Sequence, residues 1–418
     1  MGKKVNKKSS YKLPGIGERL EVTVDSVAFG GSGICRFHDL VIFIPFAIDE
    51  DRVEIEITEV RRSYAKARIC RILKPSPFRT VPVCTHYERC GGCQYQHIAY
   101  AHQLEIKRHQ VVEAFERIGK TQDPPVREVI PSPMPYTYRG KAEFHLRFTP
   151  GRAPLIGYKE AADSRIVKVL RCEIVDETIN RSLTDLRAKL KAVASGRRGG
   201  KREERLVLWS KTEGNTDVDR GISSGRNGRV IRQVKGKALH VPAQGFSQAN
   251  TALVDTMVDR VVQACALSGD ETVLDAYCGS GLFSLFLAPH ALQLFGVDAD
   301  EEAICCAGEN LREEGVLNAQ FFAGDVGEIL RNAFLEKHQP VNVVVLDPPR
   351  IGCSPDVLDD LLRLNPDRIV YISCNPATQA RDIRHLLDGG YILKELQPLD
   401  MFPQTKHIEV IGLLERST

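Results

Sequence analysis

From about residue 244 to the C-terminus, short apolar segments typical of buried strands alternate with segments that have the spacing of helices. The clearest strand candidates are residues 272–277, 294–298, 342–347 and 368–373. A tight Cys-Gly-Ser-Gly loop at 278–281 follows the first strand and opens a helix. Because this alternation joins parallel strands through helices, it predicts a doubly wound α/β sheet. Open sheets of this class hold their ligands at the carboxyl ends of the strands.

The whole chain divides into four predicted parts. They are a basic tail at 1–13, a small β domain at 14–75, a central α+β domain at 76–242 and the α/β domain at 243–418. The β domain is predicted from alternating apolar and polar residues over 20–27 and 52–60. Several short strands in such a segment favour a small barrel of the OB type, a common platform for nucleic acids. A barrel that only packs against its neighbour is the alternative.

Composition and charge exclude some classes of protein. The 418 residues contain no apolar run of about 18 residues, so we expect no membrane span. The basic N-terminus leads into no apolar signal core, so we expect a cytoplasmic location. A net charge of +3 does not by itself indicate a nucleic-acid-binding protein. Basic clusters at 3–8, 61–62 and 197–205 would bind phosphate or lie on a solvated surface, and the last belongs to a segment, 189–205, that we expect to be an exposed connection.

Acidic residues at strand ends suggest which cofactor the α/β domain binds. The glycine loop at 278–281 lacks the third glycine of a dinucleotide fingerprint. Asp298 ends the next strand, where its carboxylate would accept hydrogen bonds from a ribose diol, and Asp325 suits an adenine amino group. This series favours S-adenosylmethionine over NAD, and a dehydrogenase is the alternative.

One cysteine occupies a position suited to catalysis. Cys374 follows the strand at 368–373 and precedes Asn375 and Pro376, downstream of an Asp-Pro-Pro-Arg segment at 347–350. A thiol at a strand's carboxyl end is better placed for nucleophilic attack than for packing, although a buried structural cysteine is the alternative. Arg350 is a plausible partner for phosphate or for catalytic carboxylates.

A second set of cysteines has the spacing of metal ligands. Cys84, Cys90 and Cys93 lie close together around two glycines, and Cys172 would supply a fourth thiolate after an intervening β segment. Four thiolates suit either a [4Fe–4S] cluster or structural zinc, and the spacing alone does not decide between them.

Several motifs together resemble one family. They lie, in order, at 246–250 (Phe-Ser-Gln-Ala-Asn), 274–281, 346–350, 371–376 and 407–409 (His-Ile-Glu). In this combination the chain resembles the S-adenosylmethionine-dependent RNA 5-methyluridine methyltransferases, in particular the bacterial 23S ribosomal RNA branch. The resemblance covers nearly the whole chain. It implies a Rossmann-like methyltransferase domain, a TRAM domain at 14–75 and a central domain that carries a [4Fe–4S] cluster.

The resemblance also implies roles for individual residues. The cofactor contacts would be Gln248, Tyr277, Asp298, Asp325 and Asp347. The nucleophile would be Cys374 and the general base Glu409, and the cluster ligands would be Cys84, Cys90, Cys93 and Cys172. Two positions depart from the family pattern: Leu282 stands where Asn is common, and Asp298 stands where Glu is common. No side-chain contact is therefore expected from Leu282.

By the same resemblance, the reaction would be methylation of uracil C5 through a covalent adduct between the cysteine and C6 of the base. The expected substrate is RNA, with 23S ribosomal RNA preferred and transfer RNA as the alternative. From other classes, a radical methylthiotransferase and a noncatalytic RNA-binding protein are the competing hypotheses. No protein partner is indicated, and a monomer is the default.

Overall fold

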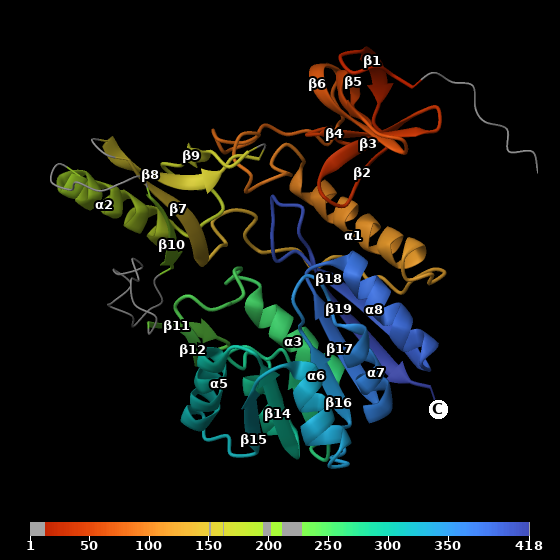
Figure 1. Ribbon diagram of the computed structural model, residues 1–418, viewed down its shortest axis with the longest axis vertical. Coiled ribbons are helices and arrows are strands. Elements are labelled where there is room, and N and C mark those ends of the chain that lie inside the picture. The colour runs from red at the N-terminus through yellow and green to blue at the C-terminus, as the bar shows by residue number, and fades with distance from the viewer. Residues whose placement is uncertain (1–12, 150–151, 162, 195–201, 211–227, 418) are drawn as a thin grey trace, which may run out of the picture.

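The computed structural model describes residues 13–149, 152–161, 163–194, 202–210 and 228–417, drawn as ribbon in Figure 1. The predicted basic tail at 1–13 lies outside this part of the chain except for its last residue, as does much of the basic segment 189–205. Within the described ranges, no helix is long and apolar enough to cross a lipid bilayer.

The N-terminal part is one sheet with both antiparallel and parallel strand pairs, and it packs against helix α1 (Tyr100–Arg117) at one end of the molecule (Figure 1). Its strands are β1 (Arg19–Thr23), β2 (Ser26–Val27), β3 (Ser32–Phe37), β4 (Leu40–Pro45), β5 (Arg52–Val60) and β6 (Tyr64–Lys74), in the order β1-β5-β6-β4-β3-β2. Val53, Ile55 and Ile57 alternate along β5 and are buried, as the sequence pattern predicts. Closure of this sheet into an OB-type barrel stays a prediction.

The central part contains a second sheet. Its elements are β7 (Lys141–Thr149), β8 (Arg152–Lys159), β9 (Ile166–Lys168), α2 (Glu177–Ala194) and β10 (Arg202–Trp209), with strand order β10-β7-β8-β9. Helix α2 covers one face of this sheet, where Ile179 and Leu183 pack against Phe144 and Leu208. The range therefore has the α+β character that the sequence predicts.

Two further elements of the range 76–242 pack on the C-terminal sheet instead. Helix α1 (Tyr100–Arg117) contributes Val111 and Phe115 to a core shared with that sheet, and the hairpin of β11 (Arg229–Val234) and β12 (Lys237–Pro242) contributes to another. These contacts join segments far apart in the sequence, which local sequence patterns do not reveal. The predicted domain boundaries stay a prediction.

The C-terminal part is a seven-stranded sheet with helices on both faces. Its strands are β13 (Thr272–Ala276), β14 (Gln293–Asp298), β15 (Ala319–Ala323), β16 (Val343–Leu346), β17 (Arg368–Ser373), β18 (Tyr391–Leu399) and β19 (Glu409–Arg416). Its helices are α3 (Val254–Cys265), α4 (Ser284–Leu287), η2 (Ala288–His290), α5 (Glu301–Glu313), α6 (Val326–Ile329), η3 (Leu330–Leu335), α7 (Pro355–Leu364) and α8 (Pro376–Asp388).

The order of the strands positions the site. The order is β15-β14-β13-β16-β17-β19-β18, and the first five strands are mutually parallel, which confirms the doubly wound α/β prediction. Strands β18 and β19 form an antiparallel hairpin on the β17 edge. The chain leaves β13 toward one edge and reaches β16 on its other side. This reversal makes the carboxyl ends of β13 and β16 a topological switch point, where such sheets bind ligands.

Candidate active site

All seven residues predicted to bind cofactor or to catalyse line one cavity at the carboxyl end of the sheet. They are Gln248, Tyr277, Asp298, Asp325, Asp347, Cys374 and Glu409. The cavity has a volume of about 670 Å³. Small-molecule sites generally have volumes of roughly 300–1,000 Å³, so this cavity has room for a nucleoside-sized ligand.

The glycine loop after β13 forms one wall of this cavity. Gly279 and Gly281 both have positive φ, and a Cβ on Gly281 would come within 3.1 Å of the Ala307 Cβ on α5. The tight turn that glycine permits therefore lets α5 approach the loop. The Gly279 N–H donates to Asp298 Oδ2 at 2.9 Å, which fixes the carboxylate at the end of β14.

Asp325 reaches the cavity from the start of α6. Its Oδ1 accepts a hydrogen bond from the Glu328 N–H at 3.0 Å and so caps the helix. Asp298 and Asp325 thus lie at the ends of adjacent strands, β14 and β15, as the sequence predicts.

Asp347 follows β16 at the switch point. Its N–H donates to the Ala276 carbonyl at 3.3 Å, so the start of the Asp-Pro-Pro-Arg segment is tied to β13. Removal from bulk water, together with the nearby carboxylates of Asp275 and Asp298, raises the pKa of Asp347 to about 7. Several carboxylates in so confined a space favour a cationic ligand.

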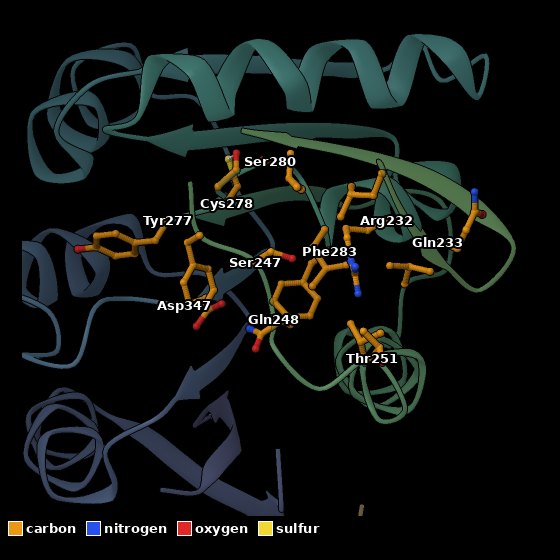
Figure 2. Close-up of a pocket in the computed structure, with 17 residues that line it drawn as sticks. Arg232, Gln233, Ser247, Gln248, Thr251, Tyr277, Cys278, Ser280, Phe283 and Asp347 are labelled. Carbon is orange, nitrogen blue, oxygen red and sulfur yellow. Dashed lines mark hydrogen bonds between the residues drawn. The ribbon is translucent and has the colours of Figure 1, made fainter. Parts of the chain in front are cut away.

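A narrower cavity opens beside the first and shares Gln248, Tyr277, Gly279 and Asp347 with it (Figure 2). Among the residues that the structure describes, the buried Oε1 of Gln248 has no hydrogen-bond partner. A buried amide oxygen without a partner is costly, so a polar ligand group is expected to satisfy it.

Cys374 is the one residue between the end of β17, at Ser373, and Asn375, the N-cap of α8. Asn375 caps α8 through its side chain, which accepts from the Ala377 N–H, and Pro376 begins the helix. Strand β17 pairs with β19 so that Ser373 faces Val410, which brings the adjacent residues Cys374 and Glu409 to the same end of the pair. Both side chains line the cavity.

Nearby charges shift the pKa values of Cys374 and Glu409 in opposite directions: carboxylates raise them and Arg350 lowers them. Burial, and then the Glu409 carboxylate, raise the pKa of the Cys374 thiol, while a hydrogen bond from Arg350 lowers it. Burial, and then Asp347, raise the pKa of Glu409 well above its ordinary value, while Arg350 again lowers it. Arg350 is therefore the cation that favours the ionised form of both groups.

Arg350 is held from two sides. Its Nη2 lies 2.6 Å from His407 Nδ1, and burial followed by the Arg350 charge lowers the pKa of His407 to about 3. His407 is therefore neutral at pH 7 and accepts the hydrogen bond. The Arg350 carbonyl accepts from Asn375 Nδ2 and Thr378 Oγ1, both at 3.1 Å.

The four cysteines predicted as metal ligands line a separate cavity together. All four are free thiols, and the His86 N–H donates to Cys84 Sγ at 3.4 Å. Within the described residues, no three His, Cys, Asp or Glu side chains are grouped as metal ligands, so the predicted cluster is not confirmed. The cavity is next to the catalytic one and shares Arg350 and Phe402 with it.

Comparison with known proteins gives the family. A profile described as tRNA (Uracil-5-)-methyltransferase matches residues 230–417, and a TRAM domain profile matches residues 15–70. An uncharacterized RNA methyltransferase of Halalkalibacterium halodurans is 32% identical over 446 residues, covering 95% of this chain and 96% of its own. A similar protein of Gloeobacter violaceus is also 32% identical and covers 96% of this chain and 97% of its own. The chain belongs to the RNA (uracil-5-)-methyltransferase family.

The fold agrees with this assignment. The crystal structure of Pyrococcus abyssi tRNA (uracil-54, C5)-methyltransferase, in complex with S-adenosyl-L-homocysteine, superposes with a TM-score of 0.70 at 24% identity. The match covers 94% of this chain and 100% of that one. The predicted enzyme class, the methyltransferase fold and the N-terminal TRAM domain are thus confirmed for this methyltransferase.

Sequence reasoning missed two features of the methyltransferase site. Asp275 lies inside apolar strand β13 and is fully buried, and burial raises its pKa to about 7. A carboxylate within a run of apolar residues was the available signal. Asp275 acts on the site through its charge near Asp347, whereas Phe402 lines the cavity itself, from the loop between β18 and β19. Nothing in the local sequence of Phe402 marks it as a site residue.

Proposed function

We propose that this methyltransferase methylates carbon 5 of uracil in RNA, with S-adenosylmethionine as the methyl donor and Cys374 as the nucleophile. The observation that carries the proposal is the meeting of Cys374 and Glu409 in the cavity that the strand-end acids line. A nucleophile and a base at adjacent positions are what C5 methylation of a pyrimidine requires.

The cavity residues fit S-adenosylmethionine. Asp298 ends β14 with one oxygen bonded to the glycine loop, a position suited to a ribose diol, and Asp325 is suited to the adenine amino group. The carboxylate of Asp347 and the amide of Gln248 face the remaining space and are suited to the cationic amino-acid end. When bound, the cofactor supplies an electrophilic methyl group that carbon 5 of an activated uracil takes up.

Cys374 activates the base in the proposed mechanism. Uracil C5 is a weak nucleophile, and addition of the Cys374 thiolate to C6 moves the electrons of the C5–C6 double bond toward C5 and the C4 carbonyl. The thiol must first ionise, and the hydrogen bond from Arg350 favours the thiolate against the effect of burial. The target uridine must leave any base stack to reach Cys374, so single-stranded or loop RNA is the expected substrate.

Glu409 completes the reaction as the general base. Its carboxylate takes the proton from C5, the electrons of that C–H bond re-form the C5–C6 double bond, and the Cys374 thiolate leaves C6. The raised pKa of Glu409 makes its carboxylate a stronger base than an exposed glutamate once it is ionised. The two side chains thus act in sequence on the neighbouring carbons of one ring.

Release of tritium from RNA that carries [5-³H]uridine tests this function. The wild-type enzyme with S-adenosylmethionine is expected to release tritium, because only substitution at C5 removes that hydrogen. Cys374→Ala is expected to release none, whereas Cys305→Ala, at an exposed cysteine on α5, should release it at the wild-type rate. Turnover by Cys374→Ala would contradict the mechanism.

For the RNA class, we propose ribosomal RNA. The TRAM domain and the cysteine set support this choice, since they match the cluster-bearing 23S branch that the sequence resembles. Transfer RNA is the second candidate, favoured by the description of the matching family profile. Mapping of 5-methyluridine in both RNA classes of a deletion strain separates the two, because the missing modification identifies the substrate.

We also propose that Cys84, Cys90, Cys93 and Cys172 hold a [4Fe–4S] cluster. The four thiols line one cavity, none forms a disulfide, and backbone N–H groups point at several of the sulfurs. N–H donors of this kind stabilise metal-bound thiolates. When bound, the cluster would supply a rigid cross-link between the segments 84–93 and 172, while the methylation chemistry would stay with Cys374 and Glu409.

A further inference from the structure

The loop between β18 and β19, residues 400–408, carries side chains into the active site. Phe402 lines both the catalytic and the cysteine cavities, His407 lines the cysteine cavity, and the loop ends at Glu409, the first residue of β19. The loop is buried over much of its length: Asp400 is 0% exposed and Thr405 is 2% exposed. Its conformation therefore determines where His407 stands, and together with the pairing of Leu399 with Glu409 it fixes the start of β19.

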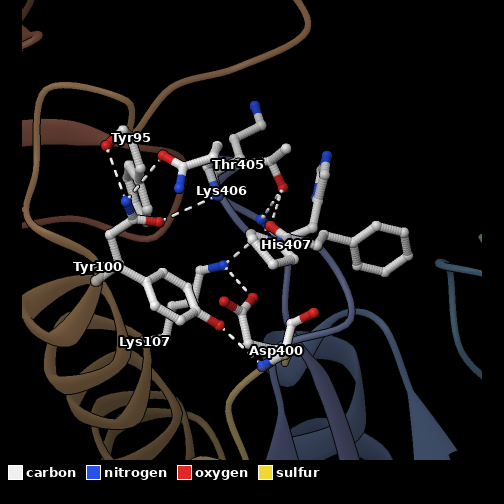
Figure 3. A network of polar contacts seen from close by, with 12 residues as sticks. Tyr95, Tyr100, Lys107, Asp400, Thr405, Lys406 and His407 are labelled. Carbon is white, nitrogen blue, oxygen red and sulfur yellow. Dashed lines mark hydrogen bonds and ion pairs between the residues drawn. The ribbon is translucent and has the colours of Figure 1, made fainter. Parts of the chain in front are cut away.

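A buried ion pair anchors the first turn of this loop (Figure 3). Lys107 of α1 donates from Nζ to Asp400 Oδ1 at 2.6 Å and to the Phe402 carbonyl at 3.1 Å. Both Lys107 and Asp400 are 0% exposed. Lys107 is the only side chain in the described residues that an ion pair links to Asp400.

Hydrogen bonds anchor the middle of the loop to the same region of sequence. The Gln103 side chain on α1 donates to Gln404 Oε1 at 3.0 Å and accepts from the Gln404 N–H at 3.1 Å. The Gln404 carbonyl accepts from the N–H groups of Gln94 and Tyr95 at 3.1 and 2.9 Å. The Lys406 N–H also donates to Gln94 Oε1 at 3.3 Å, so residues 94–107 hold the loop at three places. They begin directly after Cys93.

Stability alone does not account for a buried pair of this kind. Removing an ammonium and a carboxylate from water is costly, and proteins in which well-packed apolar residues replace such a pair are often as stable or more so. The charged pair instead gives the start of the loop one defined conformation, because Lys107 Nζ donates to both Asp400 and the Phe402 carbonyl. Such a contact determines the direction in which the loop leaves β18.

We propose that Lys107 and Asp400 are positioning residues for proton abstraction: through the 400–408 loop they hold His407 and Glu409 in place for the reaction at Cys374. The proposal rests on the function proposed above.

The effect is confined to one chemical step. Glu409 follows the loop immediately, whereas Cys374 stands after β17, and the parallel part of the sheet supports that strand on its other side. Arg350, which favours the Cys374 thiolate, keeps its anchors at Asn375 and Thr378 when the loop shifts. Loss of the pair is therefore expected to spare addition of the thiolate and methyl transfer, and to slow removal of the C5 proton. A displacement of about 1 Å in such a group lowers the rate by roughly 100-fold.

RNA containing 5-fluorouridine separates these steps. Fluorine at C5 cannot leave as a cation, so the reaction stops as a covalent protein–RNA adduct before Glu409 acts. Trapping therefore reports addition and methyl transfer, while tritium release from [5-³H]uridine RNA reports the complete cycle. Both are measured with S-adenosylmethionine on the full-length protein.

The informative variants are Lys107→Met, Gln404→Ala and the double variant Lys107→Met with Asp400→Leu, which leaves no unpaired charge. Arg79→Met is the control, because Arg79 and Asp51 form another largely buried ion pair, one that lies at the N-terminal sheet. The three test variants are expected to trap RNA within about 3-fold of the wild-type rate and to release tritium about 10- to 100-fold more slowly. Arg79→Met should change neither rate, whatever it does to the melting temperature.

Each other outcome overturns the inference. Tritium release by the double variant and by Gln404→Ala at the wild-type rate would show that the loop needs no anchor. A parallel fall of trapping and release would show a general structural role. If the wild-type protein trapped no RNA, the proposed function would fail first, and the inference would fall with it. The inference alone would be overturned if the wild-type protein and Glu409→Gln both trapped 5-fluorouridine RNA while the three test variants released tritium at the wild-type rate. The proposed function would then still hold.

Discussion

Cys374 and Glu409 stand at the same end of one antiparallel strand pair. The pairing of Ser373 with Val410 sets this relationship, so the backbone ladder between β17 and β19 brings the two side chains together. Directly opposed residues in such a ladder have Cβ atoms about 4.5–5.5 Å apart, which suits attack and proton removal on neighbouring ring carbons. The strand ladder therefore brings the proposed catalytic pair together, and Glu409 lies at the point where this ladder meets the 400–408 loop.

Glu409→Gln should stop the reaction after methyl transfer. The amide keeps the size of the side chain but cannot accept the C5 proton, so the covalent adduct should accumulate on ordinary RNA. Loss of a general base lowers turnover by roughly 10²- to 10⁴-fold. Denaturing gels measure the adduct, and tritium release measures turnover. Glu415→Gln on the same strand, where Glu415 pairs with Arg368, is the control and should behave as wild type.

The rate of methylation should rise with pH. Cys374 and Glu409 both act in their ionised forms and both have raised pKa values, so protonation of either group lowers activity as the pH falls. Arg350→Met removes the cation that lowers both pKa values, and should shift the rise to higher pH. The control Arg363→Met removes an exposed cation from the buried Asp360 on α7, which keeps its ion pair with Arg331. An unshifted pH profile of tritium release for Arg350→Met would contradict this role.

Asp298→Asn should weaken cofactor binding without unfolding the domain. The carboxylate accepts from the N–H groups of Gly279 and Asp300, and the amide keeps an oxygen for only one of them. It also loses the charge that strengthens hydrogen bonds to a ribose diol. Charged hydrogen bonds contribute about 1.5–3 kcal/mol, so the affinity should fall by roughly 10- to 100-fold. Calorimetry with S-adenosylhomocysteine measures the change, with the exposed Glu301→Gln as the control. Equal affinities in wild type and Asp298→Asn would refute the ribose contact.

Cys172→Ala should remove bound iron. The protein purified without oxygen is expected to contain four iron atoms and four sulfides if the proposed cluster forms. Elemental analysis and the visible absorption of the protein give the measurement, and zinc in place of iron would contradict the proposal. Cys305→Ala is the matched control, because Cys305 is exposed on α5 and should leave the metal content unchanged.

Gly352→Ala should destabilise the loop that carries Arg350. Gly352 has a φ of +80°, and a Cβ there would lie 2.3 Å from Asp382 Oδ2, an oxygen that accepts from Cys353 N–H and Tyr371. Strain of this kind costs about 1–3 kcal/mol, which denaturant unfolding measures. Gly308→Ala, in α5 with no atom within 4 Å of the new Cβ, should be neutral or slightly stabilising.

Local sequence patterns were sufficient to predict the α/β sheet and the positions of its polar strand ends. Strands such as β13, β16 and β17 are short and apolar, and in a parallel sheet the residues that follow them necessarily meet at one edge. Cys374, Asp347 and Asp298 could therefore be assigned to one site from the amino-acid sequence alone. The N-terminal β domain was predicted for a similar reason, because β5 alternates with period two, whereas its identity as a TRAM domain followed from the family resemblance.

Contacts between distant segments could not be predicted in this way. Lys107 lies in a helix whose sequence is amphipathic and rich in charge, yet it pairs with Asp400 far along the chain. Val126 bridges to Leu396 and thereby extends the C-terminal sheet from within the predicted central part. Neither contact has a local signal. The residues next to a single charged or apolar side chain in the sequence do not indicate whether that side chain faces water or packs against a distant segment.

The most direct test of the account is to identify the residue that holds the RNA. Wild-type protein is incubated with S-adenosylmethionine and 5-fluorouridine RNA, digested with protease and nuclease, and analysed by mass spectrometry. The account predicts one methylated fluorouridine adduct, attached to the peptide that contains Cys374. Attachment at any other residue, or no adduct under conditions that support turnover of ordinary RNA, would contradict it.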